Sequence, residues 1–112
     1  MQCIVVRPNG SRGSVDMGSS DASQRKALQG AVGGYVEALT VPLEPPMVLW
    51  VNEHGALNSL ELNRWATMFM GYPIVGAVAV TGGPNHHGGV RSVPEVWRLM
   101  LLDGLIPGVS NA

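Results

Sequence analysis

The chain has 112 residues, of which 46% are hydrophobic and only 13% are charged, and its formal net charge is −1. A charge so close to neutral excludes a general electrostatic attraction to nucleic acid or to an anionic membrane surface. No apolar run approaches the ~20 residues that span a bilayer. The length fits one domain with one core. The low charged fraction predicts some apolar surface that meets a partner or a second copy of the chain.

The single cysteine, Cys3, lies in an apolar run at the start of the chain. One cysteine cannot form an internal disulfide, and its apolar neighbours predict a buried thiol. Such cysteine usage is typical of a reducing compartment. No charged segment followed by a long apolar stretch opens the chain, as a secretory signal would require. We therefore expect a soluble, cytoplasmic protein.

The first part of the chain predicts a strand, a loop and a helix. Residues 1–6 end in three β-branched side chains and predict the strand. Residues 9–20 are rich in Gly, Ser and Asn, which predicts a flexible loop. Ser20 can cap a helix over residues 21–32, which the two glycines after it would end. On this helix we expect three polar side chains to face water, those of Gln24, Arg25 and Lys26.

The middle of the chain predicts two strands and a short helix. Residues 35–40 alternate apolar and polar side chains, as a strand does. Residues 47–51 are apolar on both faces and predict a strand in the centre of the sheet. A helix over residues 62–70 follows, and either Ser59 or Asn63 could cap it.

The last part of the chain predicts a strand, a loop and a helix. Residues 74–81 form the second long apolar run and predict a strand. Residues 82–91 are rich in glycine and predict a flexible loop. Ser92 and Glu95 stand at the spacing of a capping box, which predicts the start of the last helix. Residues 108–112 should fray.

These elements predict one α+β domain over residues 1–112. We expect a small four- to five-stranded, mainly antiparallel sheet, with the helices packed on one face and the order β-α-β-β-α-β-α. No internal repeat and no second domain is visible in the sequence.

The glycine-rich loop is the best candidate for a binding site. Its glycines could leave backbone N–H groups free, and it runs into the predicted N-terminus of the last helix, where an anion is favoured. A phosphate or carboxylate ligand would suit such a place, although a surface loop with incidental histidines is the alternative. The predicted ligand-binding residues are Asn85, His86, His87, Gly88, Gly89 and Arg91, with Arg64 contributed by a second subunit. Secondary candidates are Glu37, Glu53, His54 and Asn63.

No motif for catalysis, metal binding or cofactor binding stands at diagnostic spacing. The loop lacks the spacing and the lysine of a phosphate-binding P-loop. His86 and His87 are adjacent and would point apart in an extended loop, so they do not make a metal site by themselves. The serines lack the context of a catalytic nucleophile. We therefore predict no catalytic residue, no metal and no cofactor.

Four short motifs carry a resemblance to a known family. They are Gly33-Gly34-Tyr35-Val36-Glu37, Val51-Asn52-Glu53-His54-Gly55, Leu62-Asn63-Arg64-Trp65-Ala66-Thr67 and Pro73-Ile74-Val75-Gly76. In this order, over residues 1–81, the chain resembles an uncharacterised short domain of unknown function found in bacteriophages and mobile elements. The resemblance implies a phage-borne accessory protein in the cytoplasm of a bacterial host, with no established activity.

Three functional hypotheses follow. The first is a non-catalytic, possible anti-defence protein that binds or sequesters a small anionic, nucleotide-like ligand. The second is a protein-interaction module that inhibits a host factor. The third is a small phosphoester hydrolase, which the lack of a catalytic arrangement disfavours. In each case the low charge and the methionine-rich apolar segments favour a homo-oligomer.

Overall fold

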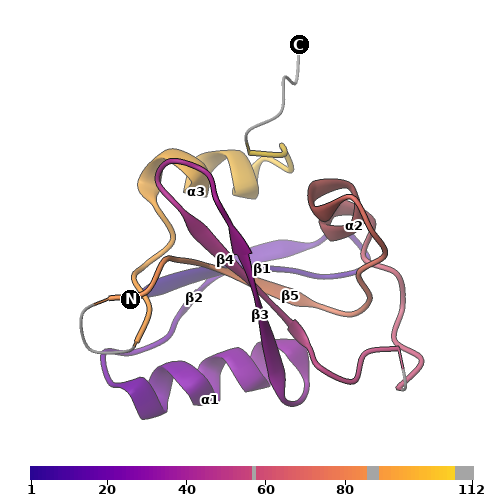
Figure 1. Cartoon of the computed structure of the whole chain (residues 1–112), viewed down its shortest axis with the longest axis horizontal. Coiled ribbons are helices and arrows are strands. Elements are labelled where there is room, and N and C mark those ends of the chain that lie inside the picture. Colours follow the sequence, from indigo (N-terminus) through magenta and orange to yellow (C-terminus); the bar gives the residue numbers. More distant parts are fainter. Residues whose placement is uncertain (57, 86–88, 108–112) are drawn as a thin grey trace.

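The computed structural model describes residues 1–56, 58–85 and 89–107. Its elements are, in chain order, β1 (Gln2–Val6), β2 (Arg12–Asp16), α1 (Asp21–Val32), β3 (Val36–Val41), β4 (Met47–Asn52), α2 (Arg64–Met70), β5 (Val78–Gly82) and α3 (Glu95–Leu102). They form one five-stranded antiparallel sheet and three helices, which confirms the predicted α+β class (Figure 1). None of the described helices is both long enough and apolar enough to cross a membrane.

The sheet joins two hairpins through a central strand. Its order is β2-β1-β5-β4-β3, so the hairpins β1–β2 and β3–β4 lie on either side of β5. In the register of the sheet, Val80 of β5 lies between Ile4 of β1 and Leu49 of β4. The most apolar strands, β1, β4 and β5, are therefore the inner ones, as the apolar run at residues 47–51 predicts.

Strand β2 lies inside the segment predicted as a flexible loop, and that part of the loop prediction is wrong. The turn before the strand and the residues after it do have loop character: Gly10 has φ 87°, Gly18 has φ 71°, and Asn9 Oδ1 accepts a hydrogen bond from the backbone N–H of Ser11. The strand itself carries few apolar side chains because it lies at the edge of the sheet. The strand forms because its backbone pairs with β1, where Cys3 lies opposite Val15. The order of the elements is otherwise as predicted.

The helices cover both faces of the sheet, so the expectation of helices on one face is wrong. Cys3 and Val5 of β1 pack in a core with Leu28 of α1, whereas Ile4 and Val6 pack in the core under α2 and α3. Figure 1 shows α1 on one side of the sheet and α2 and α3 on the other. The physical reason is the alternation of side chains along a strand: an inner strand that is apolar on both faces needs cover on both.

The ends of α1 and α2 are set by local capping. Ser20 Oγ accepts from the backbone N–H of Ser23 at 3.1 Å, and Gly33 ends α1 in the left-handed conformation with φ 78°. Asn63 is the N-cap of α2, and its Oδ1 accepts from the N–H of Ala66 at 3.1 Å. Of the two predicted caps, Asn63 is therefore the correct one.

The start of α3 differs from the prediction. Its N-cap is Pro94, without a side-chain cap, so the predicted capping box is wrong. Ser92 Oγ instead accepts from the backbone N–H of Gln2 at 2.9 Å, and Glu95 pairs with Arg98 at 2.9 Å. The hydroxyl of Ser92 therefore holds the segment before α3 against the start of β1.

Cys3 is a fully buried free thiol, as predicted. Burial disfavours its thiolate and raises the pKa to about 11, although a backbone hydrogen bond acts in the other direction. This thiol is therefore part of the core and unreactive at neutral pH.

Candidate functional site

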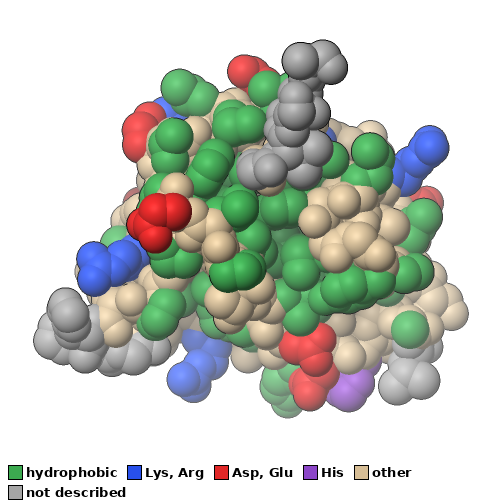
Figure 2. Space-filling view, turned by 45° about the horizontal axis from the view of Figure 1, so that its top comes forward, with side chains coloured by type: hydrophobic (Ala, Val, Ile, Leu, Met, Phe, Trp, Pro, Cys, Tyr) green, Lys and Arg blue, Asp and Glu red, His purple; other side chains and the backbone are tan. Residues whose placement is uncertain are grey.

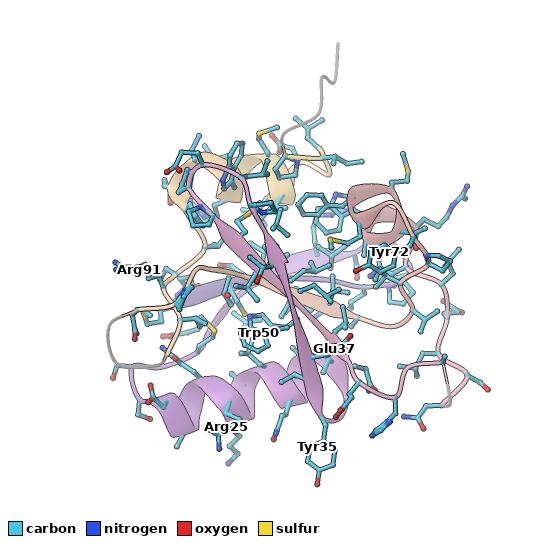
Figure 3. All side chains as sticks on the ribbon, viewed as in Figure 1. Arg25, Tyr35, Glu37, Trp50, Tyr72 and Arg91 are labelled. Carbon is cyan, nitrogen blue, oxygen red and sulfur yellow. The ribbon has the colours of Figure 1, made fainter. Side chains whose placement is uncertain are left out.

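A pocket of about 280 Å³ lies between α1, the sheet and the loop after β5. It is lined by Asp21, Gln24, Arg25, Leu28, Val36, Trp50, Gly89 and Val90. We call it the α1 pocket. Figure 3 shows Trp50 between the sheet and α1, and Arg25 on the helix. The pocket combines an aromatic ring, aliphatic side chains and two opposite charges, which is the mixture found in small-molecule sites.

Trp50 supplies the aromatic wall of the pocket. It lies on β4, opposite Ala38 of β3 and Ala79 of β5. Both neighbours are small, so the indole is only half-buried. Its Nε1–H donates to Thr81 Oγ1 at 2.9 Å, which fixes the orientation of the ring. A planar ligand could therefore pack on a ring that is already held in place.

Gln24 and Gly89 join α1 to the loop wall. Gln24 is 4% exposed, so the prediction that it faces water is wrong. Its Oε1 accepts from the N–H of Val90 at 3.2 Å and its Nε2 donates to the carbonyl of Val90 at 3.3 Å. A Cβ on Gly89 would lie only 2.7 Å from Asp21 Oδ1, so the backbone approaches α1 as closely as a glycine permits.

The predicted anion site in residues 82–91 is only partly described. His86, His87 and Gly88 lie outside the described residues. The N–H of Gly89 donates to Asn85 Oδ1 at 3.0 Å and that of Arg91 to the carbonyl of Gly83 at 2.9 Å. These two amides are therefore not free, contrary to the expectation for the loop. Ligand binding by the loop stays a prediction. The structure places Gly89 of the loop next to Asp21, at the start of α1.

Arg91 and Arg64 lie apart from the α1 pocket. Arg91 is exposed on the outer side of the loop (Figure 3) and does not line the pocket. Arg64 is exposed at the start of α2, on the opposite face of the sheet. Its contribution from a second subunit stays a prediction. Its neighbour Asn63 is fully buried, and its side-chain amide donates to the carbonyls of Val6 and Gly76, each at 3.0 Å. Asn63 is thus a structural residue.

A second pocket, of about 210 Å³, brings together two of the secondary candidates. Glu37 and Glu53 both line it, with Tyr72. Figure 3 labels Glu37 on the strand and Tyr72 after α2. His54 lies outside the lining, with its Nε2 4.0 Å from a carboxylate oxygen of Glu53. Two carboxylates make this pocket unsuitable for an anion.

Sequence reasoning missed the residues that define the α1 pocket. Gln24, Leu28 and Val32 recur at the i, i+4, i+8 spacing of one helical face, and this periodicity could have shown that Gln24 is buried. Trp50 stood in an apolar run and was indistinguishable from a core residue. Among the residues described, no group of three or more His, Cys, Asp or Glu side chains is placed to hold a metal ion.

Comparison with known proteins places the chain in a family. Neither the curated proteins nor the solved structures give a match. A family described as "Domain of unknown function (DUF3846)" matches residues 1–101. The match confirms the predicted likeness to an uncharacterised domain and extends it past residue 81 into α3. Because it covers nearly all of the 112 residues, the chain belongs to the DUF3846 family of domains of unknown function.

Proposed function

We propose that this chain is a non-catalytic binding protein that sequesters a small anionic, nucleotide-like ligand in the α1 pocket. The observation that carries the proposal is that the half-buried ring of Trp50 and the exposed guanidinium of Arg25 line one pocket. An indole face stacks on a planar base, which contributes about 1–3 kcal/mol per base. A guanidinium binds a phosphate through two parallel hydrogen bonds.

The remaining polar groups of the pocket suit the base rather than the phosphate. Asp21 lies in the first turn of α1, where its carboxylate already offsets the positive end of the helix dipole. It would repel a phosphate and accept hydrogen bonds from an amino or ring N–H group. The expected arrangement is therefore a base on Trp50 with an edge toward Asp21, and the phosphate at Arg25.

Binding is favoured over hydrolysis by the composition of the pocket. Of its lining residues in the described chain, the ionisable ones are Asp21 and Arg25. A phosphoester hydrolase would need an activated nucleophile or water as well. The resemblance to domains of phages and mobile elements supports an accessory role, in which removal of a nucleotide signal counters host defence.

The test is calorimetric titration with a panel of linear and cyclic nucleotides. Arg25→Ala is compared with Lys26→Ala, which removes the same charge from the next, exposed position but does not line the pocket. Loss of a charge-assisted hydrogen bond costs about 1.5–3 kcal/mol. Arg25→Ala should therefore weaken binding at least about tenfold and Lys26→Ala less than about twofold.

Two outcomes would count against the proposal. If no nucleotide binds, or if both variants bind as wild type does, the α1 pocket is not a nucleotide site. If the ligand is recovered hydrolysed after the protein is denatured, the chain is an enzyme rather than a sequestering protein. Trp50→Phe adds a further readout, because it should remove any ligand-induced quenching of the indole fluorescence.

A surface feature favours the second candidate function, a protein-interaction module. Four exposed apolar side chains, which we call the α2–α3 patch, are Met68 at 71% exposure, Val96 and Leu99 at 58% each, and Leu105 at 38%. Figure 2 shows hydrophobic side chains gathered over the face that carries α2 and α3. Such patches often mark protein interfaces. A host factor retained by wild type and released by Leu99→Asp would support this function.

A further inference from the structure

The two edges of the sheet differ in what they present to solvent. In an antiparallel sheet the backbone groups of successive residues point alternately to one neighbour and to the other. The N–H of Glu53 donates to the carbonyl of Tyr35 at 2.9 Å, and Val36 lies opposite Asn52. By this alternation, Glu37, Leu39 and Val41 bond to β4. The backbone groups of Val36, Ala38 and Thr40 point outward.

The edge at β2 is protected. There the N–H of Met17 donates to the carbonyl of Met1, and the N–H of Arg7 to that of Ser11. By the same alternation, the backbone N–H and C=O groups of Arg12, Ser14 and Asp16 point outward, away from β1. Two of these three are charged, and Arg12 is also tied to the carbonyl of Leu101 at 2.8 Å. Charged side chains on an edge discourage pairing with another strand.

The edge at β3 is less protected, because the one charged residue of the strand, Glu37, lies at a position bonded to β4. Its three outward positions are uncharged, and Ala38 and Thr40 are exposed. In the described part of the chain, no strand lies beyond β3. A row of outward backbone N–H and C=O groups, on residues whose side chains are uncharged, is a template for pairing with another strand.

We propose that β3 pairs with β3 of a second copy, antiparallel, about a two-fold axis through Ala38. Residues opposite each other must share a face and, at a bonded position, must both point outward. An arrangement centred on any one residue of β3 meets both conditions, but only a centre at Ala38 pairs all three outward positions with one another. With the centre at Ala38, that residue lies opposite itself and Val36 lies opposite Thr40. All three outward positions are then paired, and the two five-stranded sheets become one.

Tyr35 and Thr40 would make suitable contacts with a second copy in this register, in which the exposed Glu37 lies opposite Leu39. Tyr35, just before β3, is 68% exposed. It would lie opposite Val41 of the second copy and next to its Leu39, on the same face of the sheet, so its ring would cover apolar side chains. Thr40 of the second copy would lie beside Val36, which lines the α1 pocket. A second copy thus adds a residue to the rim of that pocket. The pairing does not depend on the proposed ligand.

The first experiment compares two proline variants by sedimentation velocity at micromolar concentration. Ala38→Pro removes an outward N–H of β3, and Ser14→Pro removes the matching outward N–H of β2. Neither N–H belongs to the bonding within the sheet, so both variants should keep their circular dichroism spectrum. We expect wild type and Ser14→Pro to be dimers and Ala38→Pro to be a monomer.

The second experiment fixes the register and does not depend on the proline variants folding. Opposite residues of a bonded pair have Cα atoms about 5.5 Å apart, within the range that a disulfide spans. Ala38→Cys should therefore form a disulfide-linked dimer under mild oxidation. The two Thr40 residues would be about 13 Å apart along the strands. Thr40→Cys alone should not cross-link, whereas a mixture of Val36→Cys and Thr40→Cys should. Wild type, with only the buried Cys3, is the control.

Three results would overturn the proposal. The first is a wild type that is monomeric at micromolar concentration. The second is a dimer that survives Ala38→Pro but is lost in Leu99→Asp, which would assign the interface to the α2–α3 patch. The third is equal cross-linking of Thr40→Cys and Ala38→Cys, which would exclude this register.

Discussion

The side-chain amide of Gln24 binds both backbone groups of Val90, as a neighbouring strand would. The two contacts, at 3.2 and 3.3 Å, lie in a buried site and tie α1 to the loop after β5. Gln24→Leu keeps the size of the side chain but leaves a buried N–H and C=O without a partner. An unsatisfied buried group costs about 1–3 kcal/mol. We expect a loss of that order in urea unfolding, with faster hydrogen exchange at the Val90 amide.

Gln24→Glu is the informative companion variant. It keeps the acceptor for the Val90 N–H but places a carboxylate oxygen against the Val90 carbonyl. We expect it to be less stable than Gln24→Leu at neutral pH and to recover as the pH falls and the carboxyl becomes protonated. Equal stability of both variants at all pH values would mean that the contact to the carbonyl is unimportant.

Gly89→Ala should displace the loop wall of the α1 pocket. The added Cβ would lie 2.7 Å from Asp21 Oδ1 and 2.8 Å from Gln24 Oε1. Overpacking of this kind costs about 1–3 kcal/mol. Gly13→Ala is the matched control, because nothing lies within 4 Å of its Cβ position. Thermal unfolding should separate the two variants, and similar melting temperatures would show that the wall yields easily.

Asn63→Asp tests which contact of Asn63 matters most. Asp is as good an N-cap as Asn, so capping alone predicts little change. Here the side-chain amide also donates to two carbonyls at 3.0 Å inside the core, and a carboxylate would repel both. We expect a loss of more than about 3 kcal/mol in urea unfolding, because a charge is buried against acceptors. Arg64→Ala, at the exposed next position, should change stability by less than about 0.5 kcal/mol.

The buried thiol of Cys3 predicts a pH dependence of stability. Its pKa is raised to about 11 in the folded chain, against ~8.5 in an unfolded one. The stabilisation is fully present below the lower value and is lost as the pH rises toward the higher one. In this interval the unfolded chain binds fewer protons, so the free energy of unfolding falls by up to about 1.4 kcal/mol per pH unit. Wild type should therefore lose stability more steeply than Cys3→Ala from about pH 8.5 to 10.5. Parallel curves would contradict this.

Much of the fold could be predicted because its signals are local. The bounds of α1 follow from Ser20 and Gly33, and the inner position of β4 follows from its apolar run. β2 could not be predicted because only Val15 carries a strand signal, and the strand exists through its partner. The apolar faces of β1 and β4 did imply cover on both sides, but which helix takes which face depends on how the chain crosses the sheet.

The candidate site was harder to predict because its residues meet only in the folded chain. Arg25 and Trp50 come from a helix and a strand that are separated in sequence by the whole of β3. Neither residue has a neighbour in the sequence that marks it as functional. The glycine-rich loop was singled out for an anion at the start of α3, and the structure places its Gly89 against α1 instead. Its target, the start of α1 rather than of α3, depends on the tertiary packing.

The central position of β5 has a consequence for biosynthesis. Because β5 pairs with both β1 and β4, the two hairpins share no strand partner until residues 78–82 have left the ribosome. Until then a nascent chain holds two separate hairpins, each with an extra open edge. Contacts between residues as distant as Ile4 and Val80 make folding slow. The unfinished chain would therefore be most prone to aggregation, or to capture by a chaperone, just before β5 emerges.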